Sequence, residues 1–233
     1  MVEIPHNPSR SNPMRKFDRA EIYIDIETIP TQEKDMQAYV LQSIKAPANY
    51  KDPEKIAAYL DEAKEKALDE CGFEGSTNHI ICIGVAIDDH PAVSFSANNV
   101  KDEAKMLRMF YSYLVENCIP HGNKVIGHNI VGYDLKIIKQ RSMILGVKPE
   151  GIALPFNAKS WDSEIFDTML QWDSKNSIKL EKLALALGIK AKKTMAGSDV
   201  YGAWKNGLHD MIADYCRNDV ELTREVYKKM KGF

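Results

Sequence analysis

Cysteine is scarce in this sequence, and its few positions are scattered. Cys71, Cys82, Cys118 and Cys216 form no Cys-x-x-Cys pair, which argues against a zinc site and against a disulfide framework. We therefore expect buried, unreactive thiols in a reducing compartment.

The sequence also lacks a long apolar run and an excess of charge of one sign. No hydrophobic stretch approaches the ~20 residues that a membrane-spanning helix needs, so we expect no membrane association. The formal net charge is only −2, and overall basicity therefore does not mark a nucleic-acid binder. The same balance still allows nucleic acid as a substrate, because clustered carboxylates make a metal site negative and phosphate contacts can be local.

What remains is the composition of an ordinary globular protein. The chain has 233 residues, of which 44% are hydrophobic and 27% charged, and this is enough to bury the core of an α/β domain. Residues 1–20 are polar, contain three prolines and lack the apolar region of a signal peptide. They predict a flexible leader on a cytoplasmic protein. Residues 21–233 are expected to form one domain, with a charged insert at about 31–78 that is too small to fold alone.

Hydrophobic periodicity and the placement of glycine and proline predict the secondary structure. Outside the insert, three strands come first, helices and strands then alternate, and two helices close the chain. This order predicts an α/β sandwich with a mixed central sheet flanked by helices. The expected strands are 21–27, 79–87, 92–95, 124–127 and 161–167, and the expected helices are 53–71, 102–116, 133–145, 177–187 and 208–230.

The first expected strand carries two acids, Asp25 and Glu27, two positions apart. Residues at this spacing point to the same face of a strand, where two carboxylates repel each other and are costly to bury. A divalent cation would resolve both problems. The alternative is a strand with a solvated face, although the apolar residues around the two acids make that less favourable.

Two further patterns are weak when taken alone. Asn129 and Asp134 flank a loop that leads from a strand into a helix, which is where α/β sheets place ligand-binding residues. Asp134 could equally be a first-turn acid that complements the helix dipole. Tyr215 and Asp219 are four residues apart in the last helix and share a face, but an exposed polar pair would show the same spacing.

Together, the three patterns in this order resemble the DEDDy family of 3′→5′ exonucleases. The segment Ile24–Pro30 is similar to stand-alone exonucleases related to the proofreading domain of family B DNA polymerases. Weaker matches are Phe166–Met169, Gly197–Val200 and the residues around Asp219.

The resemblance implies an RNase H-like fold and a hydrolytic metal site. Asp25, Glu27, Asp134 and Asp219 would hold two Mg²⁺ or Mn²⁺ ions about 3.5–4 Å apart. Tyr215 would orient the attacking water, because a hydroxyl with an ordinary pKa near 10 is a poor base at neutral pH.

Contacts to the substrate are less sharply indicated. Thr28 follows the first acid pair, and His128 and Asn129 lie in the loop before Asp134, so these three are candidate contacts to the terminal nucleotide. Lys192 and Lys193, with Lys190, form the densest basic group and are candidates for phosphate binding. Trp172 and Trp204 could stack on bases, but for both we expect core packing.

The substrate indicated by the resemblance is the unpaired 3′ end of single-stranded DNA. RNA is the first alternative, because the hydrolysis does not use the 2′-OH and only groups that read the sugar would differ. A binding module on the same fold is the second, although all four acids and the tyrosine are present. The chain has no polymerase motif, so a role in replication, repair or recombination would require a protein partner, and the oligomeric state stays open.

Overall fold

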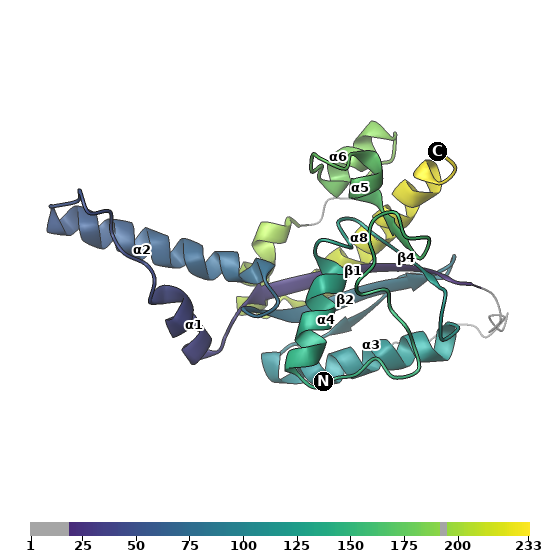
Figure 1. The fold of residues 1–233 in the computed structure, drawn as a ribbon, viewed down its shortest axis with the longest axis horizontal. Helices are drawn as coiled ribbons and strands as arrows, with labels where there is room; N and C mark the ends of the chain where they lie inside the picture. The colour runs from purple at the N-terminus through teal and green to yellow at the C-terminus, as the bar shows by residue number, and fades with distance from the viewer. Residues whose placement is uncertain (1–18, 192–194) are drawn as a thin grey trace.

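Five strands form one mixed sheet at the centre of the protein (Figure 1). The computed structural model describes residues 19–191 and 195–233. The spatial order is β3-β2-β1-β4-β5, in which β2 runs antiparallel to both of its neighbours, β1 and β3, and β4 and β5 run parallel to β1. The expected α/β, RNase H-like fold is therefore confirmed. The strands are β1 (Glu21–Pro30), β2 (Asn78–Ile87), β3 (Val93–Ser96), β4 (Lys124–Gly127) and β5 (Ile165–Asp167).

Helices cover both faces of this sheet (Figure 1). They are α1 (Lys34–Leu41), α2 (Pro53–Glu70), α3 (Glu103–Asn117), α4 (Asp134–Ile144), α5 (Thr168–Trp172), α6 (Leu180–Ala186), α7 (Val200–Lys205) and α8 (His209–Met230). Three short 3₁₀ turns, η1 (Cys71–Phe73), η2 (Val100–Asp102) and η3 (Gly197–Asp199), join them. None of the described helices is long and apolar enough to cross a membrane.

The central strand β1 is buried on both sides. Ile22, Ile24 and Ile26 pack in one core with residues of α3 and α4. On the opposite face, Ile29 packs in a cluster with residues of α7 and α8. Alternation along the strand sends successive side chains to opposite faces, so Asp25 and Glu27 face the α8 side.

The charged insert forms an arm that projects from the sheet (Figure 1). Its longer helix, α2, begins as expected, because Asp52 accepts a hydrogen bond from the Glu54 backbone N–H (3.0 Å) and Pro53 is its first residue. The shorter helix α1 was not expected. Neither α1 nor α2 buries a side chain fully, so packing in the core is not what keeps this arm helical.

Several boundaries differ from the expectation for local reasons. β1 continues to Pro30 rather than ending at residue 27, since a proline is tolerated at a strand end. The expected strand 161–167 is reduced to Ile165–Asp167, because Asp162 accepts a hydrogen bond from the Lys159 backbone N–H (2.8 Å) and turns the chain there. The short helices α5 and α7 carry too few turns to show a periodicity.

Candidate active site

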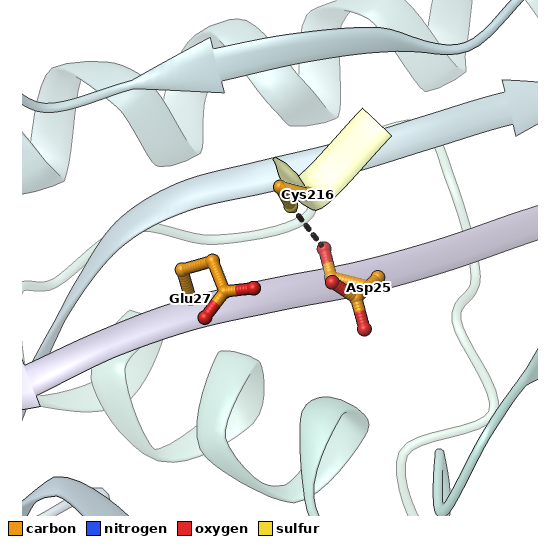
Figure 2. A group of neighbouring side chains, drawn as sticks. All are labelled: Asp25, Glu27 and Cys216. Carbon is orange, nitrogen blue, oxygen red and sulfur yellow. Dashed lines mark hydrogen bonds between the residues drawn. The ribbon is translucent and has the colours of Figure 1, made fainter. Parts of the chain in front are cut away.

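Two carboxylates occupy the centre of β1 beneath α8. Figure 2 shows Asp25 and Glu27 side by side on the strand, with Cys216 of α8 above them. Glu27 is only 9% exposed, and Oδ2 of Asp25 is buried with no hydrogen-bond partner. An unpartnered buried carboxylate oxygen is expensive, so these side chains require a further ligand.

Asp134 joins them from the first turn of α4. It is 4% exposed, and its Oδ1 accepts a hydrogen bond from the Ile26 backbone N–H (3.1 Å), the residue between the two β1 acids. The loop before α4 is fixed by Asp167 at the end of β5, which accepts hydrogen bonds from the backbone N–H groups of Asn129 (2.9 Å) and Val131 (3.2 Å). Asp167 is a buried anchor, and the sequence marks it only as part of the Phe166–Met169 match.

Tyr215 and Asp219 come from α8, and a glycine in β2 lets this helix approach. Gly84 lies opposite Asp25 in the antiparallel pair. A Cβ atom at Gly84 would lie 2.8 Å from Cγ2 of Val220 and 3.0 Å from Sγ of Cys216, so any larger residue would push α8 away from the sheet. The Asp219 carboxylate lies near enough to the Tyr215 hydroxyl for its negative charge to raise the pKa of Tyr215, and their four-residue spacing puts both on one face of α8.

These acids lie close enough to change one another's protonation. Burial raises the pKa of Asp25 well above its ordinary value, and the negative charges of Glu27, Asp134 and Asp219 raise it further. Burial likewise raises the pKa of Glu27 and of Asp134. Burial also raises the pKa of Asp219, to about 6. The metal-free site therefore tends to retain protons.

The donor set fits a divalent cation. One ligand atom from each of Asp25, Glu27 and Cys216 lies within 4.8 Å of the other two, and Asp134 is hydrogen-bonded to the same stretch of β1. Carboxylate oxygens are the ligands that Mg²⁺ and Mn²⁺ prefer. A bound cation would satisfy Oδ2 of Asp25 and neutralise the clustered charge.

Tyr215 is held in its neutral form. Burial raises its pKa, and the negative charges of Asp219 and Glu27 raise it further. In the metal-free site its hydroxyl therefore keeps its proton at neutral pH and can donate a hydrogen bond.

Two of the expected substrate contacts are engaged within the protein. The Thr28 hydroxyl donates to the Gly72 carbonyl (2.7 Å) and lies 2.6 Å from the Tyr133 hydroxyl. Both ring nitrogens of His128 have partners, the Thr168 hydroxyl at 2.9 Å and the Ile178 carbonyl at 2.7 Å. A polar contact from the Thr28 hydroxyl or from either His128 ring nitrogen would have to replace one of these hydrogen bonds.

The other candidate substrate contacts, and the two tryptophans expected to pack in the core, have different outcomes. Asn129 has φ +62° in the loop before α4, a left-handed conformation that asparagine tolerates. Lys192 and Lys193 lie outside the described residues. Core packing was wrong for Trp172, which is 48% exposed, whereas Trp204 is partly buried against the α7–α8 cluster.

A cleft opens beside the Tyr215–Asp219 end of the site. It has a volume of about 210 Å³, and its lining includes Glu181, Lys190, Met195, Tyr215, Asn218 and Asp219. Lys190 was expected near the substrate only as part of the lysine group, and Asn218 only as part of the match around Asp219. Glu181 was not anticipated, because it comes from α6 and reaches the cleft only when α6 packs on α8.

The fold places this chain in the RNase H-like class of α/β domains. Residues 76–233 match the family described as a predicted 3′-5′ exonuclease related to the exonuclease domain of PolB, and the chain belongs to this family. The expected relationship to family B proofreading domains is thereby confirmed. The matched residues contain Asp134, Tyr215 and Asp219 and begin after the arm, so Asp25 and Glu27 lie outside them.

A solved structure supports the same fold. The chain is similar to a family B DNA polymerase from the hyperthermophilic archaeon Pyrobaculum calidifontis, with 15% identity and a TM-score of 0.57. The similarity covers 91% of this chain but only 24% of the polymerase. No curated protein matches the chain.

Proposed function

We propose that this protein is a metal-dependent 3′→5′ exonuclease that hydrolyses phosphodiester bonds at the 3′ end of single-stranded DNA. Hydrolysis adds water across the terminal bond, releases a nucleoside monophosphate and leaves a new 3′-OH. The observation that carries the proposal is that Glu27, Asp134 and Asp219 lie near enough for their charges to raise the pKa of Asp25, one of whose oxygens is buried without a partner among the described residues.

Four acids from three elements would hold two Mg²⁺ or Mn²⁺ ions. Asp25 and Glu27 supply ligands from β1, Asp134 from α4 and Asp219 from α8. When bound, such ions supply Lewis-acid stabilisation of the charge that develops as a phosphodiester is cleaved. The hydrogen bond from the Ile26 backbone to Asp134 keeps one oxygen of this carboxylate fixed, so the other is free to bind a ligand.

Tyr215 would position the nucleophile. Its raised pKa keeps the proton on the hydroxyl, so Tyr215 can donate a hydrogen bond that orients the attacking water. Tyr215 shares a face of α8 with Asp219, so its hydroxyl would lie near a proposed metal ligand.

Two considerations favour a single DNA strand. A paired end must first be opened before its last nucleotide can enter a buried site, and opening costs free energy. The family's relation to a polymerase exonuclease domain favours DNA. RNA remains the second candidate, because the proposed metal site would cleave either backbone.

The test is a hydrolysis assay on a 5′-labelled single-stranded DNA, run beside the same sequence as RNA and as duplex DNA. With Mg²⁺ or Mn²⁺ we expect a ladder that shortens from the 3′ end, and chelator should stop it. Asp25→Ala should be inactive. Asp61→Ala, which removes an exposed acid from the remote helix α2, is the matched control and should be fully active.

Other outcomes would redirect the proposal. Faster cleavage of RNA than of DNA would assign the enzyme to RNA. Absence of cleavage with every substrate and metal would overturn catalysis by the isolated chain, in favour of a binding module or an enzyme that requires a protein partner.

A further inference from the structure

Cys216 stands out because it lies among the metal-binding acids without a role in the proposed hydrolysis. Its side chain comes down from α8 toward β1 (Figure 2), and its thiol donates a weak hydrogen bond to the Asp25 carbonyl (3.4 Å). Cys216 is fully buried. The close approach of α8 to Gly84 requires only a small side chain here, and alanine or serine would satisfy that requirement as well.

Asp25 and Glu27 each have a carboxylate oxygen close to the sulfur of Cys216. A ligand atom of each of Asp25, Glu27 and Cys216 lies within 4.8 Å of the others. Within the described ranges, Oδ2 of Asp25 has no partner, and no hydrogen bond reaches the carboxylate of Glu27, a residue that is only 9% exposed. This cluster is the only such group of acids, cysteines and histidines among the described residues.

We propose that Asp25, Glu27 and Cys216 form a binding site for one thiophilic divalent cation, Zn²⁺ or Cd²⁺, that overlaps the site for the catalytic ions. Zinc binds sulfur at about 2.3 Å and carboxylate oxygen at about 2.0–2.2 Å. Ligand atoms already within 4.8 Å of one another can therefore reach one ion through small side-chain rotations.

Because of the thiol, this site can bind a soft ion through sulfur, which a purely carboxylate site cannot do. Magnesium prefers oxygen ligands and is held by the acids alone, whereas a soft ion also takes the sulfur as thiolate and releases its proton to solvent. A soft ion bound in this way uses the two β1 acids that hydrolysis needs. The inference rests on the proposed function to this extent: Zn²⁺ would then inhibit the exonuclease by competing for Asp25 and Glu27.

The test is a titration of metal-free protein with Cd²⁺ at fixed pH, in the absence of nucleic acid. We expect the ultraviolet thiolate-to-cadmium absorption band to saturate at a single equivalent in the wild type and to be lost in Cys216→Ser. Cys82→Ser is the matched control, since Cys82 is a buried thiol beside Cys216, and it should keep the band.

A separate variant tests whether the carboxylates contribute to cation binding. Glu27→Gln should keep the band at saturation but require at least ~10-fold more Cd²⁺, given that even partners outside the ligand shell change metal affinity by about 10–100-fold. An unchanged affinity would mean that the thiol binds without the acids and would overturn the site.

Two further results would overturn the assignment of Cys216, namely a band that survives Cys216→Ser or one that disappears in both cysteine variants. If Cys216→Ser does not fold, the ¹¹³Cd NMR shift of the wild type decides the question, because one sulfur ligand moves it far from the range of all-oxygen sites. Since no substrate is present, a failed titration leaves the exonuclease proposal untouched, and a failed hydrolysis assay leaves a positive titration standing.

Discussion

Two buried groups of charged side chains in this protein are built in opposite ways. In the first, Glu103 at the start of α3 is fully buried, and Arg141 of α4 donates to both of its oxygens at 2.8 and 2.7 Å. The Ile80 backbone N–H (2.9 Å) and the His79 ring (3.0 Å) complete its partners. In the second, no lysine or arginine among the described residues forms an ion pair with the acids of the candidate active site, and Oδ2 of Asp25 has no hydrogen-bond donor.

The difference appears in the protonation of the acids. Burial opposes the charge of Glu103, but the hydrogen bonds from His79 and Arg141 and the charge of Arg141 bring its pKa below the ordinary value. For Asp25, burial and neighbouring acids all act in the same direction and raise the pKa. At Glu103 the fold supplies partners to a buried carboxylate, whereas no described residue supplies one to Oδ2 of Asp25. We infer that the partner comes from solution, as a metal ion.

The largest expected effect is on hydrolysis. Asp25→Ala removes a ligand and with it several kcal/mol of transition-state stabilisation, equivalent to a loss of about 10³-fold or more in rate. In chelator, the same change should leave the free energy of unfolding equal or higher, because it relieves like-charge repulsion. Single-turnover rates and urea unfolding measure the two effects. Normal turnover would contradict the metal assignment.

Removing one partner from the Glu103–Arg141 pair should lower the free energy of unfolding, unlike Asp25→Ala. Arg141→Met leaves Glu103 buried without its cation, and removal of one member of a buried ion pair typically destabilises by about 3–5 kcal/mol. Urea unfolding measures the loss, with Arg108→Met on the exposed side of α3 as the control. If the two variants were equally stable, the Glu103–Arg141 pair would not stabilise the fold.

A smaller effect is expected at Tyr215. Tyr215→Phe removes only the hydroxyl that orients water, so the rate should fall by less than the ~10²–10⁴-fold typical of a lost acid or base, while the metal ligands stay in place. The pH–rate profile should keep its shape, because the neutral hydroxyl does not titrate in the working range. A lost limb of the profile in this variant would show that Tyr215 acts as a base.

The smallest effect concerns pH and the metal-free protein. The folded-state pKa of Asp219, about 6, exceeds its unfolded value, so its contribution to stability is full below the unfolded pKa and is lost as pH rises through 6. From pH 5 to 7 this amounts to about 1 kcal/mol. Unfolding in chelator should show a loss that is about 1 kcal/mol larger in the wild type than in Asp219→Asn, because Asp25, Glu27 and Asp134, whose pKa values are also raised, contribute to both proteins. Saturating Mg²⁺ should offset it, because the ion binds the ionised acid.

Much of the secondary structure was predictable because its signals are local. The apolar run of β2, the Asp52–Pro53 start of α2 and the glycine that ends α4 each act within a few residues. The short helices α5 and α7 could not be predicted, because each spans barely one turn. The bend that shortens β5 could not be predicted either. The arm was recognised as a helical insert, but its projection away from the sheet was not.

In the candidate site, too, local features could be predicted from the sequence and contacts between distant segments could not. The spacings Asp25–Glu27 and Tyr215–Asp219 place each pair on one face of its own strand or helix, and this could be read directly from the sequence. The anchoring of the loop by Asp167 and the engagement of the Thr28 hydroxyl by Gly72 join distant segments. No spacing in the chain indicates them.

The sequence by itself therefore determined the class of fold, the residues able to bind metal and the kind of reaction they suit, because residue chemistry and short-range periodicity encode these. Only the tertiary structure decided that the acids of β1, α4 and α8 meet, that Gly84 leaves room for α8, and that Cys216 lies among the carboxylates while Arg141 pairs with Glu103. These contacts depend on how closely packed elements approach one another, and burial then sets the charge state of every group they enclose.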